Sequence, residues 1–98
     1  MVYLGRNIRK NSNLGFTYVS DQDLNDFLNE QPYFDSFTVW KAQGSWKGEF
    51  EDTCVIEVFD TDFDIIVKFA QLYIRYFYQE AVYIKISNTQ TELIERKN

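Results

Sequence analysis

Polar side chains that could contact a small charged molecule lie in the stretch "GSWKGEFEDT", residues 44–53. Glu51 and Thr53 are two residues apart, so both side chains project from the same face if this segment is a strand. Trp46 precedes them, and Gly44 leaves the backbone open to a close approach. An indole could stack on a flat or cationic ligand, and a carboxylate beside it could bind the positive charge.

Each of these residues also has a purely structural explanation. Trp46 is either an aromatic side chain that packs across a hairpin or the wall of a ligand site. Glu51 is either a solvated residue at the beginning of a strand or a carboxylate held at the rim of a cleft. Gln79 and Glu80 lie between an apolar helical segment and a strand, where they form either a polar turn or part of the same site.

The chain has no histidine and one cysteine, Cys54. These counts exclude Ser–His and Cys–His nucleophilic schemes, histidine-based zinc sites and an internal disulfide framework. We therefore expect no metal and no cofactor, and we expect Cys54 to be a small core residue. Any reaction would depend on carboxylates, tyrosines, lysines or the positioning of a substrate.

The charge of the chain limits its partners. Its net charge is −5, and its isoelectric point is about 4.6. Binding a nucleic-acid backbone needs clustered lysine and arginine, so nucleic acid is not expected as a partner. A cationic or zwitterionic small molecule, or a basic protein, remains open. We see neither a signal peptide nor an apolar segment long enough to span a membrane, and with a single cysteine we expect a cytoplasmic protein.

The 98 residues predict a single domain over residues 1–98, with a tail over 88–98 that either adds a short element or is flexible. Ser20 is placed to cap a first helix, which Pro32 would end after residue 30. Thr61 and Asp64 repeat the capping pattern before a second helix over about 62–78. Alternating apolar residues predict strands over 2–8, 37–41, 50–60 and 81–87, the last with Ile86 among its core-facing residues.

This order of elements predicts the α+β class and a ferredoxin-like βαββαβ sandwich, in which an antiparallel sheet carries both helices on one face. The other face would hold Val55, Phe59, Tyr83 and either Trp40 or Val39. Aromatic residues make up 18% of the chain, more than a small core can hide. We therefore expect dimers or trimers that pack sheet to sheet.

The succession "GSWKGEFEDT", "VIEVF", a helix and "YQEAVYIKI" resembles the small phage-encoded S-adenosylmethionine (SAM) lyases, or SAMases, formerly called SAM hydrolases. The resemblance covers residues 44–86. The family's Gly-x-aromatic hairpin, Glu-x-Thr strand start and Gln-acid pair correspond here to Gly44 and Trp46, Glu51 and Thr53, and Gln79 and Glu80. The family's aromatic residue is typically tyrosine, whose hydroxyl Trp46 lacks, and the hairpin here is shorter.

The resemblance implies an enzyme that splits SAM into methylthioadenosine and homoserine lactone. The substrate's own carboxylate displaces the thioether, so no enzymic base, metal or cofactor is needed. Glu51 would be the catalytic orienting group for the substrate's ammonium or ribose, and Trp46 a wall of the site. Thr53 and Gln79 would add substrate contacts, and Glu80 would come from a neighbouring subunit.

The family forms trimers with active sites between subunits. A SAM lyase from a bacteriophage would act in the host cytoplasm, where lowering SAM weakens methylation-dependent defence and so gives an anti-restriction effect. The alternative from another class is a non-catalytic oligomeric ferredoxin-like module that binds a nucleotide-like ligand or a host defence protein. Turnover of SAM would distinguish the two.

Overall fold

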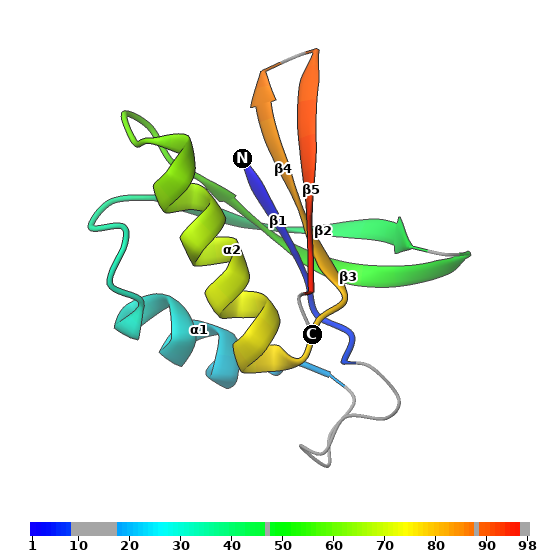
Figure 1. The fold of residues 1–98 in the computed structure, drawn as a ribbon. Coiled ribbons are helices and arrows are strands. Elements are labelled where there is room, and N and C mark those ends of the chain that lie inside the picture. Colours follow the sequence, from blue (N-terminus) through cyan, green and yellow to red (C-terminus); the bar gives the residue numbers. More distant parts are fainter. Residues whose placement is uncertain (9–17, 47, 88, 97–98) are drawn as a thin grey trace.

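The structure is a computed structural model that describes residues 1–8, 18–46, 48–87 and 89–96, without the side chains of Trp46 and Glu49. Its class is α+β, as predicted. Two helices and five strands follow one another along the chain: β1 (Val2–Gly5), α1 (Asp21–Glu30), β2 (Thr38–Trp46), β3 (Glu49–Glu57), α2 (Phe63–Phe77), β4 (Ala81–Ser87) and β5 (Gln90–Glu95). Both helices lie on one side of the sheet (Figure 1).

The sheet is antiparallel, with the order β2-β3-β1-β4-β5. Four strands were predicted, so the strand count and the full order differ from those of a four-stranded βαββαβ sandwich. The additional strand, β5, comes from the tail and pairs with β4 from Ala81↔Glu95 to Ser87↔Gln90. Of the two alternatives for this tail, residues 90–95 therefore follow the first, a short element.

The first helix has the predicted bounds, and its predicted cap is present. The Asp23 N–H donates to Ser20 Oγ at 3.1 Å, and the helix ends at Glu30 with Gln31 as its C-cap. The capping prediction for the second helix is wrong. Asp62, not Thr61, occupies the N-cap position, and its side chain makes no capping hydrogen bond.

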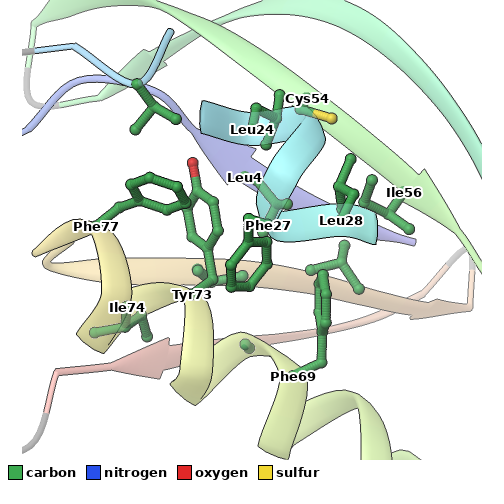
Figure 2. Packing of buried hydrophobic residues seen from close by; sticks show 14 of the residues in the cluster. Leu4, Leu24, Phe27, Leu28, Cys54, Ile56, Phe69, Tyr73, Ile74 and Phe77 are labelled. Carbon is green, nitrogen blue, oxygen red and sulfur yellow. The ribbon is translucent and has the colours of Figure 1, made fainter. Parts of the chain in front are cut away.

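The core lies between the helices and the sheet, where Figure 2 shows buried side chains from both. Phe27 of α1 is at its centre, with ring centroids of four aromatic residues of α2 within 5.4–5.7 Å. Cys54 is buried there, as predicted. The prediction for Ile86 is wrong: the residue is 45% exposed, at an irregularity of the β4–β5 pairing between Lys85 and Ser87.

The opposite face of the sheet carries no helix (Figure 1). Trp40 pairs with Val55 in register, so Trp40 and not Val39 shares the face of Val55. Tyr83 lies on the same face, because Tyr3 pairs with both Val55 and Tyr83. Phe59 lies beyond the end of β3 and is exposed.

Candidate functional site

Glu51 is held against the backbone at the end of the central strand β1 and just beyond it. The Asn7 N–H donates to Glu51 Oε2 at 3.0 Å. The carboxylate also lies over Gly5, since a Cβ built on that glycine would be 2.5 Å from Glu51 Oε1. The Glu51 carboxylate is therefore half-buried and oriented, unlike a solvated side chain, and its place at the rim of a cleft stays a prediction.

Two glycines flank this carboxylate. Gly44 of β2 pairs directly with Glu51 of β3. Gly5 lies on the other side of β3, in β1, where it pairs with Thr53. Neither neighbouring strand places a side chain beside Glu51 at these two positions. The absence of a side chain at Gly5 leaves room for the Glu51 carboxylate itself.

Gln79 also forms a hydrogen bond with Asn7, the residue that binds Glu51. Its Nε2 donates to the Asn7 carbonyl at 2.8 Å and lies 3.4 Å from the Phe77 carbonyl. Gln79 is buried directly after Tyr78, whose left-handed backbone ends α2 and turns the chain toward β4. Glu51 and Gln79 therefore both bind the backbone of Asn7, Glu51 at its N–H and Gln79 at its C=O.

Thr53 lies beside this group on the face that was predicted. Its hydroxyl donates to the Glu51 carbonyl at 3.3 Å, and its Oγ1 would be 3.1 Å from a Cβ on Gly44. Thr53 is buried, with 9% of the residue exposed.

Glu80 and Trp46 are the remaining two residues that were predicted for the site. The Glu80 carbonyl accepts the Arg96 N–H at 2.8 Å, and the hydrogen bonds that join Glu51, Asn7 and Gln79 do not involve Glu80. The backbone of Trp46 pairs with Glu49 at the end of β2. The Trp46 side chain lies outside the described part of the chain, so its role as a wall stays a prediction.

Tyr73 is a member of the group that the sequence analysis missed. Its hydroxyl donates to the Gly5 carbonyl at 2.7 Å, directly below the Glu51 carboxylate. Burial raises the pKa of this phenol far above its ordinary value, and the nearby Cys54 and Glu51 raise it further. A signal was available, because a buried tyrosine hydroxyl usually requires a hydrogen-bond partner.

The two buried groups with a raised pKa, Tyr73 and Cys54, cannot act as a base or a nucleophile near neutral pH. Tyr73 stays a protonated phenol, and burial raises the pKa of the Cys54 thiol to about 11. The thiolate, not the thiol, is the reactive form of cysteine. The group is therefore suited to orienting a ligand.

A second polar cluster, also missed, connects α1 to the sheet. Arg6 is buried, donates from Nε to the Val19 carbonyl at 2.9 Å and forms an ion pair with Asp21 at 2.7 Å. Lys41 contacts the same Asp21 oxygen at 3.0 Å. The hydrogen bonds from Lys41 and Arg6 lower the pKa of Asp21. Because Asp21 of α1 binds both Arg6, directly after β1, and Lys41 of β2, we assign the cluster a structural role.

Among the described residues, no three His, Cys, Asp or Glu side chains are grouped as they would be around a metal ion. Neither described helix is long and apolar enough to cross a membrane.

Comparisons of the chain with protein-family models, with curated proteins and with solved structures find no match. The geometry around Glu51, Asn7 and Gln79 is therefore the basis for a functional assignment.

Proposed function

We propose that this protein is a SAM lyase that cleaves SAM into methylthioadenosine and homoserine lactone. One observation carries the proposal: Glu51 and Gln79, from distant parts of the sequence, both bind Asn7. These are two of the residues that the resemblance to SAM lyases singles out.

The arrangement supports a role for Glu51 in binding a cation. The hydrogen bond from Asn7 fixes the orientation of the carboxylate over Gly5, and Gly44 places no side chain opposite Glu51 in β2. A half-buried carboxylate attracts a positive charge more strongly than one in bulk water, because the local dielectric is lower. SAM carries two positive groups, a sulfonium and an ammonium, and we assign the ammonium to Glu51.

The reaction then needs little beyond positioning. A carboxylate oxygen of the methionine part attacks its own γ-carbon, the bond between this carbon and sulfur breaks, and the electron pair stays on sulfur. The products are neutral methylthioadenosine and a lactone that keeps its ammonium, so no proton is exchanged. Holding two reacting groups together in this way can provide a large part of a rate enhancement.

Product analysis of two matched variants tests the proposal. Glu51→Gln removes the charge and keeps the size of the side chain, whereas Glu57→Gln makes the same change on the same face of β3. We expect methylthioadenosine and homoserine lactone from the wild type and Glu57→Gln, and a rate at least about tenfold lower for Glu51→Gln. Chromatography measures the products, and circular dichroism checks that each variant is folded. No product from the wild type, or an unchanged rate in Glu51→Gln, would refute the assignment.

A second candidate is a non-catalytic oligomeric module with an elaborated ferredoxin-like fold, in which β5 extends the four-stranded sheet. The exposed aromatic side chains of Trp40 and Tyr83 on the helix-free face favour it. Binding of SAM without turnover would indicate a ligand-binding module. The absence of SAM binding would indicate a protein partner instead.

A further inference from the structure

Three consecutive backbone carbonyls, at the end of β1 and just beyond it, each accept a hydrogen bond from a different part of the chain. The three pairs of acceptor and donor are Gly5 with Tyr73, Arg6 with Val19, and Asn7 with Gln79. The Arg6 carbonyl and the Asn7 N–H belong to one peptide group, and this N–H donates to Glu51 Oε2 at 3.0 Å. A donor that binds the Arg6 carbonyl therefore also orients the group that binds Glu51.

Arg6 and Val19 bind each other twice. The Val19 N–H donates to the Arg6 carbonyl at 2.7 Å, and Arg6 Nε donates to the Val19 carbonyl at 2.9 Å. Both residues are buried. Because a buried carbonyl that loses its donor costs free energy, the side chain of Arg6 holds the backbone of residue 19 in the place where its N–H meets the Arg6 carbonyl.

We propose that Arg6 is a positioning residue for Glu51. Its guanidinium binds the Val19 carbonyl, the Val19 N–H binds the peptide group between residues 6 and 7, and the N–H of that peptide group binds the carboxylate. A carbonyl that accepts a hydrogen bond polarises its own peptide group, which makes the N–H a stronger donor. The effect on SAM turnover rests on the proposed function, whereas the effect on the Glu51 carboxylate does not.

The geometry of the guanidinium suits this role. Nε donates to the Val19 carbonyl while Nη2 donates to Asp21 Oδ1 at 2.7 Å, so one planar group is fixed at two points. A lysine ammonium is a point charge on a flexible stem and does not fix two such directions. Arg6→Lys therefore keeps the charge and removes the two-point attachment.

Lys41→Gln is the matched control. Lys41 is the other cation that binds Asp21, at 3.0 Å, and its side chain is 66% exposed. The hydrogen bonds that lead from Arg6 to Glu51 do not include it. A loss that appears in Arg6→Lys and not in Lys41→Gln is therefore due to these hydrogen bonds and not to the charges around Asp21.

Nuclear magnetic resonance measures the contact between Asn7 and Glu51 without a substrate. The Asn7 amide proton should move downfield as the Glu51 carboxyl loses its proton, because an ionised acceptor forms the stronger hydrogen bond. Glu51→Gln should abolish this movement, which assigns it to Glu51. We expect Arg6→Lys to lose at least half of the movement and Lys41→Gln to keep it.

The rate of SAM cleavage is the second measurement. We expect a rate about tenfold lower in Arg6→Lys, because a displaced orienting group no longer holds the substrate for attack, and a rate close to that of the wild type in Lys41→Gln. Circular dichroism checks that each variant is folded. If Arg6→Lys does not fold, Asp21→Asn keeps Arg6 and removes the charge that anchors its guanidinium, and it should lose part of the amide movement.

An Asn7 amide that moves as far in the folded variants of Arg6 or Asp21 as in the wild type would overturn the proposal. So would an unchanged rate of SAM cleavage in Arg6→Lys, or equal losses in Arg6→Lys and Lys41→Gln. A wild type that does not cleave SAM but shows the expected amide movements would refute the lyase assignment and support the positioning of Glu51 by Arg6.

Discussion

The Glu51 carboxylate fills the space that a side chain at position 5 would need. A Cβ on Gly5 would lie 2.5 Å from Glu51 Oε1 and 2.7 Å from Glu51 Oε2, much closer than carbon and oxygen atoms can approach without a bond. The position of the proposed catalytic group therefore depends on the absence of a side chain in the adjacent strand.

We predict that Gly5→Ala displaces Glu51 and lowers SAM turnover as strongly as Glu51→Gln does. The carboxylate is the end of a flexible side chain and can move, so the fold should lose only about the hydrogen bond from Asn7, roughly 1 kcal/mol. Urea unfolding and product analysis measure the two effects separately.

Gly44→Ala is the control for this prediction, because its Cβ would meet Thr53 Oγ1 at 3.1 Å and not Glu51. We expect it to keep more activity than Gly5→Ala. Equal activities in Gly5→Ala and the wild type would show that the position of the Glu51 carboxylate over Gly5 does not matter for function.

We predict that Tyr73→Phe destabilises the protein by about 1–3 kcal/mol, because the Gly5 carbonyl loses its phenol donor inside the core. The ring contacts with Phe27 and Phe77 remain in this variant. Tyr76→Phe on the same helix removes an equivalent hydroxyl from a side chain that is 54% exposed, and it should change the unfolding free energy by less than about 0.5 kcal/mol. Similar losses in both variants would contradict the assigned role of the Tyr73 hydroxyl.

We predict that Gln79→Glu costs about 1–3 kcal/mol at neutral pH. The substitution replaces the amide donor to the Asn7 carbonyl with a carboxylate, so two acceptors face each other in a buried position. Gln90→Glu, which makes the same change at an exposed position of β5, should be close to neutral. Chemical denaturation compares the two, and a Gln79→Glu protein as stable as Gln90→Glu would show that the bond to Asn7 contributes little.

The ion pairs of Asp21 predict a dependence of stability on pH. Lys41 and Arg6 lower the pKa of this carboxyl from 3.8, so the folded state binds its proton less readily than the unfolded state does. The stabilisation is complete above the unfolded value and is lost as the pH falls through the lower folded value. Asp21→Asn should therefore have a lower urea midpoint than the wild type at pH 7, and the difference should shrink between about pH 4 and pH 2. A difference that stays constant over this range would contradict the assignment.

Local signals were enough to predict much of the fold. Ser20 and Pro32 defined the first helix because capping and the restriction before proline act within a few residues. The alternation around Cys54 predicted that Cys54 and Ile56 pack in the core, and the same alternation placed Glu51 and Thr53 on one face.

The parts that were missed depend on contacts between distant segments. The position of the Glu51 carboxylate over Gly5 follows from the register of β1 against β3, and the hydrogen bond from Gln79 to Asn7 joins residues 72 positions apart in the sequence. The exposure of Ile86 also depends on tertiary structure, because its strand extends past the region that the helices cover. Alternation along one strand contains no information about any of these.

The most direct test of the central claim is to analyse the products that form when SAM is mixed with the wild-type protein in water enriched with heavy oxygen. Mass spectrometry should detect methylthioadenosine and homoserine lactone in equal amounts, with no heavy oxygen in the first-formed lactone, because the ring oxygen comes from the substrate's own carboxylate. Unchanged SAM, or homoserine that carries heavy oxygen in its hydroxyl group, would contradict the account.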